Sequence, residues 1–256
     1  MPTNLLLHCG AREVSEEQLR SVGCPPATST WYPLPHAQVL DTVRDTLSNA
    51  GFGIQNQRFA LARKDARFFG TLDLENKVCE GVRLAVGIRS SFDKSFPIGF
   101  CCGERVLVCD NLSFGSEVII SKKHTRFGKD RFDEGVAKAL VSLREYQQVA
   151  AERIDRMRRY PLTDDHANSL MLQAWEEGII SHRLLPKVIH AYREPGLDEF
   201  LDRTAWSLFN AFTGVLMVRL SNPAVHASLT IKLQELIGSA STIVPLPNTE
   251  FPCLAA

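Results

Sequence analysis

Near residue 124 the spacing of apolar residues changes from that of strands to that of helices, and this change limits the folds that the chain can adopt. From about residue 52 to residue 122 the apolar residues fall in short runs bounded by turn residues, which is typical of strands with tight connections. After His124 the spacing becomes helical and remains so. The sequence therefore predicts an α+β fold, with an antiparallel sheet of short hairpin-connected strands packed on helices and a helical C-terminal half.

The strand region contains several apolar runs that we expect to form the sheet. They are residues 54–62, 67–75, 82–88, 96–102, 105–109 and 114–120. The turns expected between them are residues 64–65, 76–77, 90–95, 103–104 and 110–111. Gly103 followed by Glu104 suits a two-residue hairpin, because glycine at the first central position permits a positive φ.

Helices are expected on both sides of this sheet. Ser15 is the N-cap of a short helix, and a proline-rich connector leads to an amphipathic helix over residues 36–50 that Gly51 ends. A long helix is expected over residues 132–159, with an apolar stripe that includes Val149. Further helices are expected over residues 167–175 after Thr163, after Ser181, and over residues 198–220 and 223–237. We divide the chain into an α+β unit (1–160), a helical subdomain (161–238) and a flexible tail (239–256).

The amino-acid composition limits the classes of protein to which the chain can belong. The chain has 256 residues, 45% of them hydrophobic and 23% charged, and is long enough to bury its own core. Its 29 basic and 29 acidic side chains cancel, which excludes a uniformly basic coat protein of nucleic acid and a uniformly acidic mimic. We find neither a signal peptide nor a membrane-spanning stretch and expect a soluble, cytoplasmic protein without a membrane partner.

The sequence predicts neither a metal site nor a cofactor. The seven cysteines include no C-x-x-C pair, and the histidines lack the spacing of metal ligands. Without a secretion signal, an odd number of cysteines indicates reduced thiols, which act mainly as small hydrophobic residues among the strands. No phosphate-binding glycine loop is present.

Opposite charges are concentrated in two neighbouring regions. Residues 122–159 carry eleven basic and six acidic side chains, about +5, whereas residues 162–202 carry three basic and eight acidic ones, about −5. Either the two regions contact each other, within one chain or between copies, or residues 122–131 form a loop that tracks phosphates, with Phe127 and Phe132 stacking on bases. The candidate nucleic-acid-binding residues are Lys122, Lys123, His124, Arg126, Lys129 and Arg131.

The turn at residues 90–95 is a second candidate site. Its hydroxyl groups, backbone N–H groups and one lysine could hold an anion, and the candidate ligand residues are Ser91, Asp93, Lys94 and Ser95. The alternative is a purely structural hairpin in which the carboxylate of Asp93 accepts a hydrogen bond from its own backbone, as in an Asx-turn. A nucleophilic pair of Cys109 and His124 is conceivable, but the spacing does not require it, so the catalytic residues stay unassigned.

Two blocks of sequence resemble a known family. The first runs from Arg89 to Phe96 and continues through residues 105–112 to Lys122, Lys123, His124 and Thr125; the second is residues 204–213. Both resemble the phage/plasmid-like proteins grouped as domain of unknown function 932, except that Ser90 stands where an asparagine is usual. The resemblance implies a mobile-element context and brings no established activity.

The basic segment and the resemblance together lead to one functional hypothesis and two alternatives. The hypothesis is a non-enzymatic protein that binds nucleic acid, with single-stranded DNA as the preferred form, and acts as an oligomer. The first alternative is a protein-interaction or self-assembling module that binds no nucleic acid. The second is an enzyme acting through Cys109, Asp93 or His124.

Overall fold

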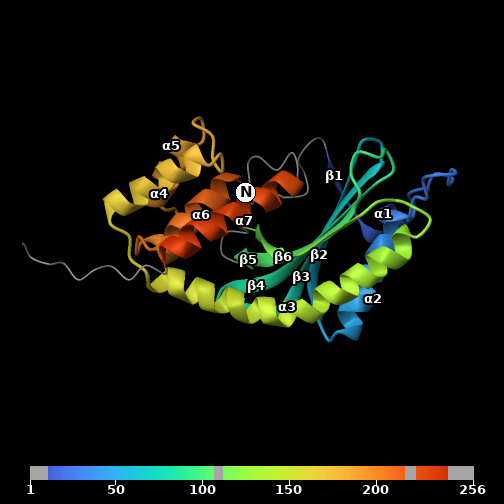
Figure 1. Cartoon of the computed structure of the whole chain (residues 1–256), viewed down its shortest axis with the longest axis horizontal. Helices are drawn as coiled ribbons and strands as arrows, with labels where there is room; N and C mark the ends of the chain where they lie inside the picture. Colours follow the sequence, from blue (N-terminus) through green and yellow to red (C-terminus); the bar gives the residue numbers. More distant parts are fainter. Residues whose placement is uncertain (1–10, 107–111, 217–222, 242–256) are drawn as a thin grey trace, which may run out of the picture.

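The centre of the molecule is an antiparallel sheet (Figure 1). The structure is a computed structural model, which describes residues 11–106, 112–216 and 223–241. Six strands follow one another in sequence order across the sheet, and each pairs antiparallel with the next. They are β1 (Arg12–Val14), β2 (Ile54–Ala62), β3 (Arg67–Cys79), β4 (Val82–Ser91), β5 (Ile98–Val106) and β6 (Leu112–Lys122). The predicted α+β class and its helical C-terminal half are confirmed.

Two of the predicted turns are wrong. Strand β3 continues through residues 76–77, where the ladder with β4 shifts register after Asp73. Gly103 and Glu104 lie inside β5 rather than in a hairpin turn. Glu104 is 1% exposed, and its carboxylate accepts hydrogen bonds from Tyr146, Arg153 and Gln234. These partners on distant elements allow a glycine–glutamate pair to continue the strand.

The sheet has one face buried under helices. Side chains such as Leu72, Leu84 and Phe100 form one hydrophobic core with α2 (His36–Asn49) and α3 (Gly128–Arg159). In Figure 1, α3 runs along this face of the sheet. The opposite face holds only a small apolar cluster among the described residues, made by Ala60, Ala62 and Phe69.

The helices before the sheet follow the sequence prediction. Helix α1 (Glu16–Arg20) begins with a capping box, in which the Ser15 hydroxyl accepts from the Gln18 N–H and the Gln18 side chain accepts from the Ser15 N–H. Helix α2 ends at Asn49, and Gly51 has a φ of +80° as expected of a C-terminal stop.

Helix α3 begins earlier than predicted, at Gly128. A Cβ atom on this residue would lie 2.6 Å from the Lys123 carbonyl oxygen, so only glycine lets the chain turn this closely from β6 into the helix. The predicted apolar stripe is wrong at Val149, which is 52% exposed and faces away from the sheet.

The C-terminal helices differ from the prediction at their boundaries. They are α4 (Asp164–Glu176), α5 (Leu185–Arg193), α6 (Ala205–Leu216) and α7 (Pro223–Ala240). Thr163 caps α4 as predicted, but α5 has Leu184 rather than Ser181 at its N-cap. The helix predicted over residues 198–220 is divided, because Arg203 has a left-handed φ of +48° between a 3-10 turn and α6. Helix α7 includes the first two residues of the predicted tail, and residues 242–256 lie outside the described residues.

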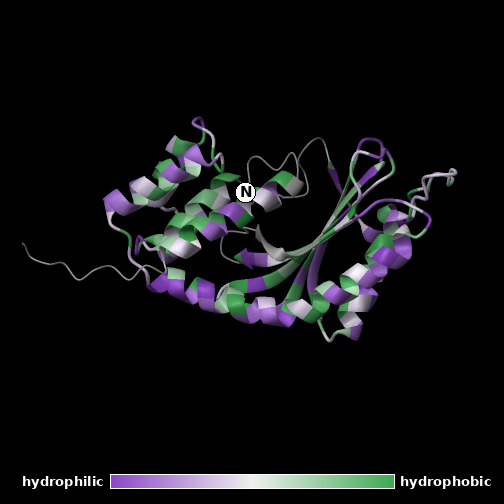
Figure 2. Cartoon of the chain, in the orientation of Figure 1, coloured by the Kyte–Doolittle hydropathy of each residue, from purple (hydrophilic) through white to green (hydrophobic). Residues whose placement is uncertain are grey.

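The two ends of the molecule are built from different elements. Helices α4 to α7 gather at one end, whereas α1, the start of α3 and the tips of the β2–β3 and β4–β5 hairpins lie at the other (Figure 1). Figure 2 shows α6 as largely hydrophobic, while α3 alternates between polar and apolar faces. Within the described ranges, none of the helices has the length and apolar character needed to cross a membrane.

Candidate functional site

The two segments predicted to bind ligands lie at the same end of the sheet. Lys122 of β6 pairs with Ile98 at the start of β5, directly after the β4–β5 turn. Trp31 connects the two segments, because the Lys94 Nζ lies 5.0 Å from its ring centroid and the His124 ring lies 6.2 Å away. We call this region the hairpin end; it comprises the β2–β3 turn, the β4–β5 turn, Trp31 and residues 122–131.

The polar groups of the β4–β5 turn are largely occupied within the turn. Asp93 Oδ1 accepts from the Ser95 N–H at 3.0 Å, and its other oxygen accepts from Arg67 Nε at 2.6 Å. The Ser91 hydroxyl donates to the Phe96 carbonyl at 2.7 Å and accepts from its N–H at 3.2 Å. The Asx-turn is therefore present, with the Asp93 carboxylate bound to the backbone of its own turn. Partial burial raises the pKa of Asp93, but the hydrogen bonds from Ser95 and Arg67 outweigh this and leave it lowered.

Lys94 and Ser95 are exposed at the tip of this turn. Lys94 has a left-handed φ of +59°. Its ammonium group contacts the face of the Trp31 ring, an arrangement that leaves the charge accessible. Anion binding by this turn stays a prediction, and Lys94 is the group in it that can supply positive charge.

The predicted basic loop is only partly a loop. Lys122 ends β6, and Lys129 and Arg131 lie in the first turn of α3. Lys123, Arg126 and Arg131 are exposed, and the structure shows no ion pair for them with any described carboxylate.

The remaining lysines of the segment are partly neutralised. Lys129 forms an ion pair with Asp133 one turn further along α3. Lys122 is half-buried beside Gly135, and its charge helps lower the pKa of Glu134, after the larger effect of the hydrogen bond from Lys138.

The two aromatic residues of the segment have opposite positions. Phe127 is 57% exposed, and the Arg126 guanidinium lies 6.0 Å from its ring centroid. Phe132 is fully buried in the core, so the prediction that it stacks on bases is wrong. Its helical position places it on the face of α3 that packs against the sheet.

Beneath the hairpin end lies a cluster of buried polar groups that includes His124, predicted from the sequence as a binding residue, and His36, which the sequence did not indicate. His36 is fully buried, its Nε2 donates to the Asp65 carbonyl at 3.2 Å, and its ring stacks on Phe92 at 3.9 Å. His124 is 6% exposed, and its Nδ1 accepts from the Leu34 N–H at 3.4 Å. Burial lowers the pKa of His36 to about 4 and also lowers that of His124, so both rings are neutral near pH 7.

Several atoms of this cluster have no hydrogen-bond partner among the described residues. They are His36 Nδ1, His124 Nε2, Ser90 Oγ and the indole nitrogen of Trp31. The bonds made by the other ring nitrogens leave His36 Nδ1 as an acceptor and His124 Nε2 as a donor. No local sequence signal marks His36, because its burial depends on the hairpins packed over the start of α2.

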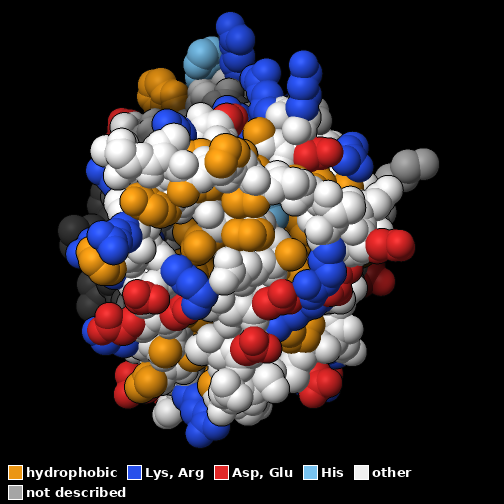
Figure 3. Space-filling view, turned by 90° about the vertical axis from the view of Figure 1, so that its right-hand side faces the viewer, with side chains coloured by type: hydrophobic (Ala, Val, Ile, Leu, Met, Phe, Trp, Pro, Cys, Tyr) orange, Lys and Arg blue, Asp and Glu red, His pale blue; other side chains and the backbone are white. Residues whose placement is uncertain are grey.

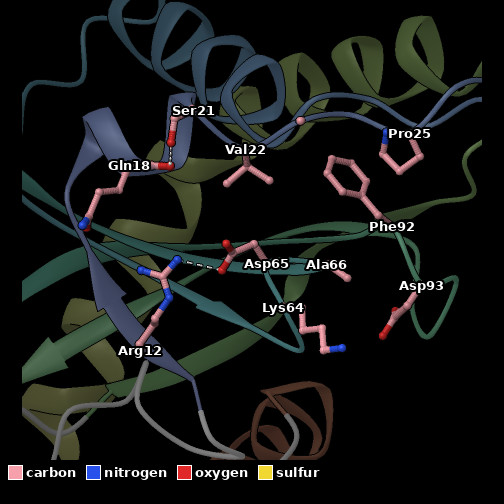
Figure 4. Close-up of a pocket in the computed structure, with 11 residues that line it drawn as sticks. Arg12, Gln18, Ser21, Val22, Pro25, Lys64, Asp65, Ala66, Phe92 and Asp93 are labelled. Atoms are coloured by element: carbon pink, nitrogen blue, oxygen red, sulfur yellow. Dashed lines mark hydrogen bonds and ion pairs between the residues drawn. The ribbon is translucent and has the colours of Figure 1, made fainter.

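A groove opens beside this cluster (Figure 4). Its volume is about 660 Å³, and α1, the following connector and both hairpin turns line it. Phe92 and Val22 give it apolar walls, and Arg12 pairs with Asp65 across it at 2.8 Å. Three consecutive residues of the β2–β3 turn, Arg63, Lys64 and Asp65, have left-handed φ angles of 54°, 55° and 64°. Such backbone strain is tolerated only where the surrounding structure holds the turn in place.

Burial raises the pKa of the described cysteines, Cys24, Cys79, Cys101 and Cys102. Burial raises the pKa of Cys101 to about 12 and that of Cys102 above its ordinary value, so both remain thiols. Cys109 lies outside the described residues, and so does the predicted turn at residues 110–111. Within the described parts of the chain, His, Cys, Asp and Glu side chains form no group of three or more that could hold a metal ion.

The acidic region of the sequence does not neutralise the hairpin end. Asp164 of α4 pairs with Arg203, and Glu199 pairs with Arg158 near the far end of α3. Helices α4 and α5, which hold much of this acidic region, lie at the opposite end of the molecule (Figure 1). Among the described residues, the ion pair that links the two charged regions, Arg158–Glu199, therefore lies near the end of α3.

A comparison with protein-family models identifies the family of the chain. The model of a family described as a domain of unknown function (DUF932) matches residues 27–223, which include the sheet from β2 to β6 and the hairpin end. The chain belongs to this family. No curated protein and no solved structure matches it.

Proposed function

We propose that this protein is a non-enzymatic, cytoplasmic protein of mobile-element type that binds single-stranded nucleic acid at the hairpin end. The observation that carries the proposal is the group of exposed cations, Lys123, Arg126 and Arg131, without carboxylate partners among the described residues. They stand next to Phe127, whose ring is more than half exposed. Cations that contact phosphates and aromatic rings that stack on bases are the two elements of single-strand binding.

The neighbouring turns add charge to the same region. Lys94 extends over Trp31, and Lys64 and Arg63 are exposed in the β2–β3 turn. Figure 3 shows this end with hydrophobic side chains near its centre and charged ones of both signs around them. The carboxylates of Asp65 and Asp93 are neutralised by ion pairs with Arg12 and Arg67. They therefore do not cancel the charge of the unpaired cations, which can attract anions.

Salt-dependent binding of a labelled oligothymidylate tests this proposal. The logarithm of the affinity should fall with the logarithm of the salt concentration, with a slope of about 0.7 for each phosphate contacted by the protein. Changing Lys123, Arg126 and Arg131 together to glutamine should reduce that slope by about 2 and leave the thermal unfolding temperature unchanged. Phe127→Ala should weaken binding roughly tenfold, because one base loses its stacking partner.

A matched variant controls for net charge. Arg183, Lys187 and Lys232 are exposed cations on or before α5 and on α7, and changing them to glutamine removes the same charge. We expect this control to bind as the wild type does. Equal affinity of the hairpin-end variant and the control would overturn the proposed site, and absence of oligonucleotide binding by the wild type would overturn the function.

Self-association is the second candidate function. Leu172 and Trp175 lie one turn apart on α4, and they are 49% and 43% exposed. Aromatic residues are enriched in protein interfaces, which favours contact of α4 with a second copy of the chain. Sedimentation velocity should show a concentration-dependent dimer that Trp175→Ala abolishes; a monomer at all concentrations would contradict this candidate.

A further inference from the structure

The second face of the sheet, opposite α3, carries several arginines. Because side chains alternate along a strand, residues next to Leu72, Leu84 and Phe100 point away from the helices. The register places the following arginines on this outer face: Arg58, Arg67, Arg83, Arg89 and Arg105. We call this the arginine face.

Acidic groups balance only part of this charge. Arg105 pairs with Asp73 at 2.7 Å, and Arg67 pairs with Asp93 at 2.6 Å. Arg58, Arg83 and Arg89 are half-buried. None of these three forms an ion pair with another residue that the structure describes, and the buried Nε of Arg83 also has no hydrogen-bond partner there.

Arg89 shows that such a cation is held in place rather than free in solvent. It lies across Gly99 of the neighbouring strand, where a Cβ atom would be 2.7 Å from the Arg89 Nε. Its guanidinium is 5.4 Å from the Phe96 ring centroid, and that of Arg67 is 5.8 Å from the same ring. Desolvation lowers the pKa of Arg89, as expected for a cation without a nearby carboxylate.

A desolvated charge without a counter-charge is unfavourable in a folded protein, and a bound anion removes that penalty. Arginine is suited to phosphate, because its planar guanidinium donates two parallel hydrogen bonds to a pair of phosphate oxygens. Small residues alternate with the arginines on the same face, among them Ala85, Gly87 and Gly103.

We propose that the arginine face is a second binding surface for the phosphate backbone of nucleic acid, with Arg83 and Arg89 as phosphate ligands. The inference rests on the proposed function, since the ligand is the same single strand. Phe96 directly follows the β4–β5 turn that carries Lys94, so a strand bound at the hairpin end reaches Arg89 by passing over Phe96.

The test uses the full chain and the same oligothymidylate titration between about 50 and 200 mM salt. The double variant Arg83→Gln/Arg89→Gln should bind roughly tenfold more weakly for each arginine removed, and its salt slope should fall by about 1.4. The double variant Arg183→Gln/Lys187→Gln loses the same charge elsewhere and should bind as the wild type does. Arg89→Lys keeps the charge but loses the two-oxygen contact, so we expect it to bind with intermediate affinity.

The outcomes separate the two proposals. If the wild type binds and the Arg83/Arg89 variant binds equally well, the proposed role of the arginine face is overturned, and the proposed site at the hairpin end is not affected. If this variant loses affinity but the hairpin-end variant does not, the arginine face is supported and the hairpin end is overturned. If the wild type binds no oligonucleotide, both are overturned. Should the double variant unfold, wild-type affinity of the folded Arg89→Lys protein would overturn the role of Arg89.

Discussion

The buried imidazole of His36 makes the stability of this protein depend on pH. The ring is fully buried, donates to the Asp65 carbonyl and stacks on Phe92, so the folded state favours its neutral form. Its pKa is about 4 in the folded protein, against 6.5 in the unfolded chain. Between these two values the unfolded state binds more protons than the folded state, so stability is complete above pH 6.5 and is lost as the pH falls toward 4.

The size of this loss follows from the two pKa values. Each pKa unit corresponds to about 1.4 kcal/mol, so full protonation removes about 3 kcal/mol, of which about 2 kcal/mol is lost between pH 7 and pH 5. That is a large part of the roughly 5–15 kcal/mol that stabilises a typical protein. The hydrogen bond from Arg44 lowers the pKa of Glu16 from 4.5 to about 2. Protonation of Glu16 therefore reduces stability only below about pH 4.5, outside the interval from pH 7 to pH 5.

Urea unfolding at pH 7, 6 and 5 measures the effect. We compare the wild type with His36→Gln, whose side chain stays neutral at every pH, and with His182→Gln, which replaces an exposed histidine. The His36 variant should lose about 2 kcal/mol less than the wild type over this interval, whatever its stability at pH 7. Parallel pH dependence of the wild type and the His36 variant would refute the reasoning, and the His182 variant should follow the wild type.

Further expectations concern packing, buried polar groups and turns. Phe132→Ala should lower the unfolding free energy by about 3–5 kcal/mol in urea titration, whereas Phe127→Ala should change it by less than about 0.5 kcal/mol; similar values would contradict their burial. Glu104→Gln should lower the free energy of unfolding by about 3 kcal/mol, because Arg153 loses its charged partner. An unchanged free energy of unfolding would mean that the Glu104–Arg153 pair is exposed to solvent. Lys64→Gly should raise the melting temperature by relieving a left-handed φ, with a gain of up to about 1 kcal/mol; a lower melting temperature would argue against that backbone conformation. Ser15→Ala should lower stability by about 1 kcal/mol through loss of the cap, and an unchanged unfolding midpoint would mean that the capping box contributes nothing.

Local features of the sequence were sufficient to predict most of the elements. Helix α2, its glycine stop and the Ser15 cap depend on residues a few positions apart, and all three are confirmed. A short apolar run bounded by turn residues predicted β2 with its correct bounds for the same reason. The prediction failed where a distant partner decides the conformation. Glu104 continues β5 because Tyr146, Arg153 and Gln234 bind its carboxylate.

Only part of the candidate site could be predicted from the sequence. Charge counting identified Lys123, Arg126 and Arg131, since an excess of cations is a property of the chain itself. It could not distinguish Phe127 from Phe132, because their difference in exposure depends on which face of α3 meets the sheet. Nor could it find the arginine face, whose members are dispersed over several strands.

The sequence by itself therefore determined the α+β class, most of the helices and strands, the basic segment and the membership of a family, because periodicity, composition and motifs are local properties. Only the tertiary structure decided that the β4–β5 turn meets residues 122–131, that His36 and His124 are buried and neutral, and that Arg83 and Arg89 share one face. The reason is that strand register and helix packing join residues far apart in the chain, and the burial they create sets exposure, pKa and the partners of each charge.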